Sequence, residues 1–364
     1  MKMKLLWVAL TAALLSAQPG IASGLKGKVV QEPLYTVSPL LVKKGVDSTY
    51  PSVAGDFMVF STNSGDRYRV ERVSKHSPAS ASRILKTMSL HEAIRFGTAV
   101  SDGSVGYVSN RTGTISAWMW LGNGESHAAI GHMGGFSGSL ASHHLNGTAD
   151  GKVWCYDTTM QKKRLNTMLN EFASNVDDEV IGQQWRTYDS DSYRHKQGYR
   201  ATESGKKNDF SAPVLYVFNR ETSQLNMIPN AYDGTVSPDG RKVVFVRETN
   251  GNYDLWMQTV DGRELTQLTD SKFGDFEPQF SPDGNKLLFV SNRNYAGAVT
   301  KSSIYMMDLK SYQITRLTNA KGAVDGGPAW LDENTVVFHS NRDLKKSQSK
   351  VDSGWNIWQL KLNK

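Results

Sequence analysis

Ser237-Pro238-Asp239-Gly240 and Ser281-Pro282-Asp283-Gly284 repeat one turn, 44 positions apart. Each copy is followed at the same offset by an apolar run, Val243–Val246 in the first and Leu287–Val290 in the second. A third run of this kind is Val336–Phe338. A period near 45 residues with one turn and several short strands is typical of the blades of a β-propeller. The sequence therefore predicts an all-β protein whose sheets are arranged in a ring.

The pattern predicts blades of four strands. The second strand is the apolar run, and the third carries an aliphatic–aromatic pair such as Leu255-Trp256 or Ile304-Tyr305. Runs that are apolar at consecutive positions indicate strands covered on both faces. Seven blades are favoured, and a six-bladed ring with one weak unit absorbed as an insertion is the alternative. The expected blades cover about 50–87, 96–130, 136–169, 180–229, 233–269, 277–318 and 328–362.

The last predicted blade ends after its third strand, at Leu360–Leu362. An unpaired edge strand invites aggregation, so the ring has to close. We expect Val29–Val37 to supply the missing outer strand and to join the two ends of the chain.

The first 23 residues have the pattern of a secretory signal peptide. Lys2 and Lys4 precede an apolar run from Leu5 to Ala17, which is followed by Pro19-Gly20 and small residues. This predicts a signal peptide over 1–23, a single propeller over 24–364, and a periplasmic or secreted protein that does not span the membrane. Cys155 is the only cysteine, so no internal disulfide is expected.

The formal charge of +7 comes from scattered basic residues. An exported protein rarely meets nucleic acid, so we expect no nucleic-acid partner. Weak attraction to anionic surfaces fits the charge better.

The repeat resembles that of the TolB family, the periplasmic members of the Tol-Pal system. The residues that carry the resemblance are Ser-Pro-Asp-Gly, Phe289–Arg293, Ile304–Asp308 and Thr315–Thr318, with Ser109–Arg111 and Ser340–Arg342 as further echoes. The resemblance implies a propeller that binds a protein in the cell envelope. TolB itself carries an α/β domain before its propeller. In this sequence only about 25 residues separate the expected signal peptide from the first expected blade, so we expect a relative with the propeller alone.

Motifs of enzymes are absent from the sequence. It contains no Gly-x-Ser-x-Gly elbow, no phosphate-binding glycine loop and no His-Glu-x-x-His helix. We therefore expect a protein- or peptide-binding module with no catalytic residues, cofactor or resident metal. The alternative is a polysaccharide-active propeller, such as a metal-dependent uronate lyase, because oligogalacturonate lyases have related repeats. His91, His195, Gln183 and Gln184 are the candidate ligands for that alternative, and a second histidine group comprises His127, His132, His143 and His144.

Two features are candidate recognition sites. Carboxylates in the loops leading to the first strand of each blade recur in phase, and they predict an acidic channel mouth that binds a cation or a basic peptide: Asp233, Asp275, Glu277 and Asp325. The alternative is that these acids only cap turns. The second feature is a long insertion near 185–210, whose aromatic and basic residues predict a recognition loop: Tyr188, Tyr193, His195, Tyr199 and Arg200.

Overall fold

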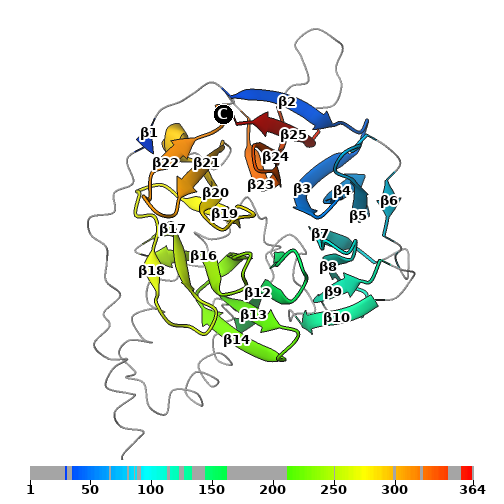
Figure 1. The fold of residues 1–364 in the computed structure, drawn as a ribbon, viewed down its shortest axis with the longest axis horizontal. Coiled ribbons are helices and arrows are strands. Elements are labelled where there is room, and N and C mark those ends of the chain that lie inside the picture. The colour runs from blue at the N-terminus through cyan, green and yellow to red at the C-terminus, as the bar shows by residue number, and fades with distance from the viewer. Residues whose placement is uncertain are drawn as a thin grey trace, which may run out of the picture.

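The repeated turns and apolar runs form a ring of blades (Figure 1). The computed structural model describes residues 29–30, 35–64, 67–79, 82–85, 87, 92–112, 115–122, 127–132, 144–161, 211–249, 251–297, 301–319, 323–342 and 354–362. Within these residues the strands form six sheets around a central axis. A 3-10 helix, η2 (Arg293–Tyr295), is the one helix found in this part of the chain.

Each blade contains four antiparallel strands, ordered from the channel to the rim. Blade 1 comprises β3 (Asp47–Ala54), β4 (Phe57–Ser64), β5 (Arg67–Ser74) and β6 (Arg83–Ile84). Blade 2 comprises β7 (Ile94–Ala99), β8 (Val105–Ser109), β9 (Ser116–Trp120) and β10 (His127–His132). Blade 3 comprises β11 (Leu145–Gly147), β12 (Val153–Gln161), β13 (Ser211–Asn219) and β14 (Gln224–Pro229). Blade 4 comprises β15 (Tyr232–Val236), β16 (Lys242–Thr249), β17 (Asn252–Thr259) and β18 (Thr266–Gln267). Blade 5 comprises β19 (Asp275–Phe280), β20 (Lys286–Ser291), β21 (Ser303–Asp308) and β22 (Ile314–Arg316). Blade 6 comprises β23 (Asp325–Asp332), β24 (Thr335–Ser340), β25 (Asn356–Lys361) and β2 (Thr36–Leu41).

The prediction of seven blades was wrong, because the units expected at 136–169 and 180–229 form one blade. Strand β12 pairs with β13 along its whole length, from Val153 opposite Asn219 to Gln161 opposite Ser211. The pair Val153-Trp154 therefore lies on the second strand of blade 3, not on a third strand. A long insertion between two paired strands made one blade resemble two.

An N-terminal strand closes the ring, although its residues differ from those predicted. Strand β2 pairs antiparallel with β25, from Thr36 opposite Lys361 to Leu41 opposite Ile357. The two strands lie side by side at the top of Figure 1. The predicted segment 29–37 overlaps β2 only at its end, and β1 (Val29–Val30) instead pairs in parallel with β22 of blade 5. The closure covers the edge that the last blade would otherwise expose.

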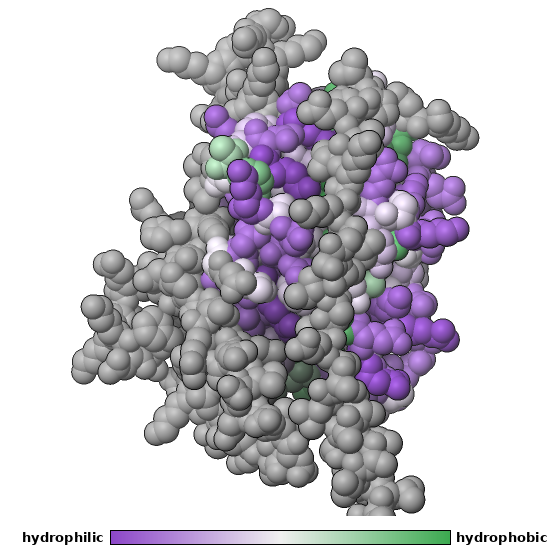
Figure 2. Space-filling view, turned by 90° about the vertical axis from the view of Figure 1, so that its left-hand side faces the viewer, coloured by the Kyte–Doolittle hydropathy of each residue, from purple (hydrophilic) through white to green (hydrophobic). Residues whose placement is uncertain are grey.

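The core lies between neighbouring blades. The second strands supply it with consecutive buried residues, since Val243–Val246 and Leu287–Val290 have exposed fractions of 0–6%. Both faces of these strands are covered, as the sequence predicted. The described residues on the side shown in Figure 2 are mainly hydrophilic.

The repeated turn has the same hydrogen bonds in both copies. The Ser237 hydroxyl donates to Asp239 at 2.6 Å, and the Ser281 hydroxyl donates to Asp283 at 2.5 Å. The glycines that end the two turns adopt φ of +69° and +71°, a region that favours glycine. The motif thus fixes the link from the first to the second strand in blades 4 and 5.

Candidate functional site

The inner strands bulge at equivalent positions. In five of the six blades the pairing register shifts at a residue with φ between +51° and +54°, followed by proline or glycine. These residues are Tyr50, Phe96, Asp233, Glu277 and Gly327. A positive φ is unfavourable for residues other than glycine, so its repetition marks a built-in bend.

Each bulge amide is bound by a side chain of the preceding blade. Ser61 accepts from the Phe96 amide at 2.9 Å, and Asp157 accepts from the Asp233 amide at 3.0 Å. The Tyr50 amide donates to His339 at 3.2 Å. The Glu277 amide donates to Asp233 at 2.5 Å, and the Gly327 amide donates to Glu277 at 2.5 Å. These hydrogen bonds link blade to blade around the channel.

The bulges also bring aromatic side chains together. The ring centroids of Tyr50 and Phe96 are 4.8 Å apart, and those of Phe96 and His144 are 4.5 Å apart. Tyr50 also contacts His339, at 4.7 Å between centroids. We call these four residues, with Asp233 and Glu277, the channel ring. One half of the channel ring is therefore aromatic and the other half acidic.

His144 joins the two halves. Its Nδ1 lies 3.1 Å from Asp233 and 4.0 Å from Asp157. Burial by itself would lower the pKa of His144, but Asp233, Asp157 and Glu277 outweigh it and raise this pKa to about 9. His144 is therefore protonated at neutral pH and compensates part of the negative charge.

Glu277 keeps one oxygen available. Burial, with a contribution from Asp233, raises the pKa of Glu277 to about 7. Its Oε2 accepts from the Gly327 amide, whereas no residue in the described part of the chain donates to its Oε1. Burial likewise raises the pKa of Asp157 to about 6. The acidic half can thus gain or lose a proton near neutral pH.

A cavity of about 470 Å³ lies along the axis, lined by inner-strand residues of all six blades. The channel ring lines one end of it, through Tyr50, Phe96, His144, Asp233 and Glu277. At the other end the lining residues belong to the turns between first and second strands, among them the exposed Pro238 and Pro282. The cavity therefore opens on the face that carries the Ser-Pro-Asp-Gly turns, and the loops leading to the inner strands lie on the other side of the channel ring.

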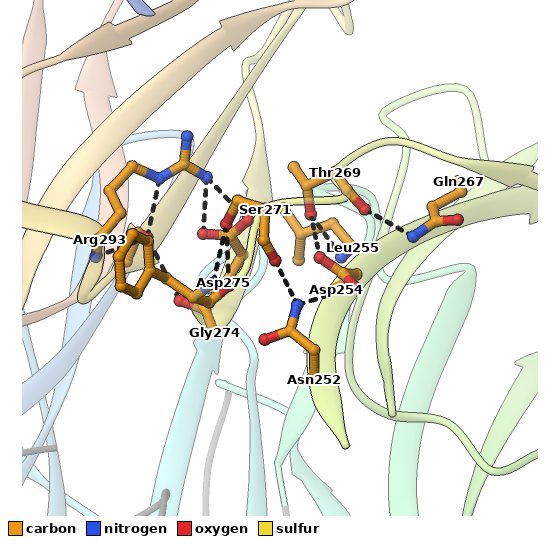
Figure 3. A network of polar contacts seen from close by, with 11 residues as sticks. Asn252, Asp254, Leu255, Gln267, Thr269, Ser271, Gly274, Asp275 and Arg293 are labelled. Atoms are coloured by element: carbon orange, nitrogen blue, oxygen red, sulfur yellow. Dashed lines mark hydrogen bonds and ion pairs between the residues drawn. The ribbon is translucent and has the colours of Figure 1, made fainter. Parts of the chain in front are cut away.

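The four predicted acids divide into two pairs. Asp233 and Glu277 line the cavity, whereas Asp275 and Asp325 are fully buried. Asp275 accepts two hydrogen bonds of 2.8 Å from Arg293 (Figure 3), and Asp325 forms an ion pair with Arg342. The arginines of the Ser-Asn-Arg echoes thus hold carboxylates of the inner strands, and the candidate binding site narrows to Asp233 and Glu277.

The recognition loop stays a prediction, because Tyr188, Tyr193, His195, Tyr199 and Arg200 lie outside the described residues. The same is true of the lyase candidates His91, Gln183 and Gln184. Within the described residues, no group of three or more His, Cys, Asp or Glu side chains is arranged to hold a metal ion. Nor does this part of the chain contain a helix long and apolar enough to cross a membrane.

Sequence reasoning missed the role of the channel ring. It considered His144 only as a member of a histidine cluster, and it did not consider Tyr50, Phe96 or His339 as channel residues. A signal was present, because Tyr50-Pro51, Phe96-Gly97 and Asp233-Gly234 place a proline or glycine at the same point of the blade.

Comparisons with curated proteins give partial matches to TolB. No family model matches the chain. A TolB homolog of Chlorobium chlorochromatii is 32% identical over 134 residues, which cover 34% of this chain and 29% of the relative. The Tol-Pal system protein TolB of Francisella tularensis is 27% identical over 82 residues, 22% of this chain and 18% of the relative. An uncharacterized protein of Agrobacterium fabrum is 44% identical over 55 residues, which cover 15% of this chain and 19% of the relative.

A solved structure has the same overall fold. An oligogalacturonate lyase in complex with manganese has a TM-score of 0.50 at 12% identity, covering 93% of this chain and 98% of that chain. TolB from Acinetobacter baumannii has a TM-score of 0.47 at 12% identity, and the match covers 87% of this chain and 63% of that chain. At 12% identity, the likeness to the lyase shows the fold alone. The matched segments span about a fifth to a third of the curated relatives, and with the repeat motifs they support a TolB-like β-propeller.

Proposed function

We propose that this TolB-like propeller is an exported, non-enzymatic module of the cell envelope that binds a protein or peptide in its central cavity. The observation that carries the proposal is the cavity itself, which opens on one face and ends at a partly acidic floor. A cavity with few, convergent polar groups is the usual form of a binding site.

The floor favours a cationic group. Three carboxylates, Asp157, Asp233 and Glu277, surround the one imidazolium of His144. The Oε1 of Glu277 is the carboxylate oxygen that remains for a ligand. A lysine or arginine side chain, or a chain N-terminus, would form a charge-assisted hydrogen bond with it.

The walls suit an extended peptide rather than a compact ligand. They combine prolines, such as Pro51, Pro278 and Pro328, with the polar side chains of Asn146 and Gln279. Asn146 donates to Gln279 at 2.9 Å across the channel, from blade 3 to blade 5. Rigid apolar surfaces with a few amides offer both contact area and main-chain hydrogen bonds.

Binding of fluorescent basic peptides, measured by anisotropy, tests the function. We expect peptides with a lysine or arginine at one end to bind, and acidic peptides of the same length not to bind. Glu277→Gln should weaken binding roughly tenfold or more, because a charge-assisted hydrogen bond is lost. Gln keeps an acceptor for the Gly327 amide, so folding is retained. Glu264→Gln, at an exposed turn of blade 4, is the matched control. Equal affinity of the Glu277→Gln protein would refute the cavity as the site.

Export is the second part of the proposal. It rests on the pattern of residues 1–23 and on the periplasmic location of the family that the repeat resembles. Fractionation of cells that produce the full chain, followed by N-terminal sequencing, tests it. A protein in the periplasmic fraction that begins near Gly24 is expected, and an uncleaved protein in the cytoplasm would contradict export.

A further inference from the structure

Two arginines face each other across the outer strands of blade 1. Arg72 on β5 is the pairing partner of Arg83 on β6. Like charges directly opposite on neighbouring strands repel each other, so this arrangement is unfavourable without a compensating group. Within the described residues neither guanidinium forms an ion pair.

Arg72 is packed between blades 1 and 2. Its guanidinium carbon lies 4.6 Å from the centroid of Phe57 and 4.8 Å from that of Trp120 on β9. Its Nη1 donates to the carbonyl oxygen of Gly103. Gly103 has φ of +86°, and a Cβ there would lie 2.9 Å from Nη1 of Arg72. The turn of blade 2 is thus shaped to accept this side chain.

Arg83 reaches the same tryptophan from the rim. Its guanidinium carbon lies 4.5 Å from the centroid of Trp120, and the residue is exposed. Stacking on Trp120 explains why the two guanidinium groups lie near each other, but it does not compensate their positive charges. Burial lowers the pKa of Arg72, and the charge of Arg83 lowers it further, whereas the charge of Asp102 raises it. Asp102 forms no ion pair with either arginine, and its carboxylate accepts from the Ser104 amide at 2.8 Å.

We propose that Arg72 and Arg83 form an oxyanion site at the junction of blades 1 and 2, which takes a phosphate group. Guanidinium groups present a planar fork of donors that matches phosphate geometry, and Arg72 has its orientation fixed in advance. The exposure of Arg83 leaves the site open to solvent. The site is distinct from the central cavity, whose floor is acidic.

The phosphate can belong to a soluble molecule or to a lipid headgroup, and two measurements separate these sources. Inorganic phosphate and pyrophosphate are titrated into the full mature chain by isothermal calorimetry at constant ionic strength. Co-sedimentation is measured with vesicles of phosphatidylglycerol and, as a neutral reference, phosphatidylcholine. Saturable binding in either arm is expected, with loss of roughly tenfold or more in affinity for Arg83→Gln.

The control removes the same charge elsewhere. Arg241 lies at an exposed turn of blade 4. Arg241→Gln should leave both phosphate binding and vesicle binding unchanged. Arg83 is exposed on a two-residue strand, so its replacement should not prevent folding; Arg83→Lys, which keeps the charge but loses the fork, should bind more weakly than wild type. Equal losses for Arg83→Gln and Arg241→Gln would show general electrostatic attraction and overturn the site. Absence of binding in both arms would overturn it as well.

Discussion

The Nδ1 atom of His144 lies 3.1 Å from the carboxylate of Asp233, across the boundary between blades 3 and 4. This contact joins the aromatic and acidic halves of the channel ring. It is largely buried, so it is screened little by salt, and its strength depends on the protonation of His144.

The contact predicts a pH dependence of stability. The pKa of His144 rises from 6.5 to about 9 on folding, so protonation is favoured in the folded state. The stabilisation is complete below pH 6.5 and is lost as the pH rises to about 9. Relative to His144→Gln, the wild type should lose roughly 3 kcal/mol of unfolding free energy across this interval. Urea unfolding at several pH values measures it, and a difference that does not change with pH would contradict the prediction.

The ion pair between Asp325 and Arg342 should be essential for blade 6. Asp325 is fully buried, so its removal leaves a largely buried guanidinium without a partner. Asp325→Ala should reduce the unfolding free energy by about 3–5 kcal/mol. The double variant Asp325→Ala with Arg342→Met should recover most of this loss. A small effect of Asp325→Ala in urea unfolding would mean that the pair is dispensable.

Ring closure predicts a sharp boundary for N-terminal truncation. A mature chain beginning at Tyr35 retains β2 and should unfold cooperatively. A chain beginning at Val42 loses β2 and exposes the edge of β25, so it should aggregate or unfold at a lower temperature. Thermal unfolding with light scattering compares the two. Equal melting temperatures would show that β2 does not hold the ring closed.

Gly327 has no room for a side chain. A Cβ at this position would lie 2.5 Å from Nδ1 of His339, which accepts from the Tyr50 amide. Gly251→Ala is the control, because Gly251 also has a positive φ but has no atom within 4 Å of the added carbon. Gly327→Ala should cost about 1–3 kcal/mol more than Gly251→Ala, through contact rather than backbone strain. Chemical unfolding of both variants checks the difference.

The sequence predicts the blades best where local and tertiary signals agree. The turns at Ser237 and Ser281 and the runs that follow them carry both the hairpin chemistry and the two-sided burial of the second strand. Blade 3 was misread because Val153-Trp154 has the composition of a third strand, and its partner strand begins only at Ser211. Pairing across such a distance leaves no local mark in the sequence.

The candidate site could be predicted only in part. The common phase of Asp233 and Glu277 predicted an acidic channel mouth, and both residues line the cavity. The same phase argument could not reveal that Asp275 and Asp325 are buried, because burial depends on Arg293 and Arg342 folding back over the inner strand. The recurrence of Ser-Asn-Arg was visible, but its partner could be identified only with the blades assembled.

The pairing of β2 with β25 also orders events during folding. Strand β2 lies beside β25, the last strand, so the final blade remains incomplete until the residues of β25 are available. The cavity needs inner strands from every blade, including β23 beside this junction. A chain that is still being synthesised therefore has no finished cavity until its last strand is in place.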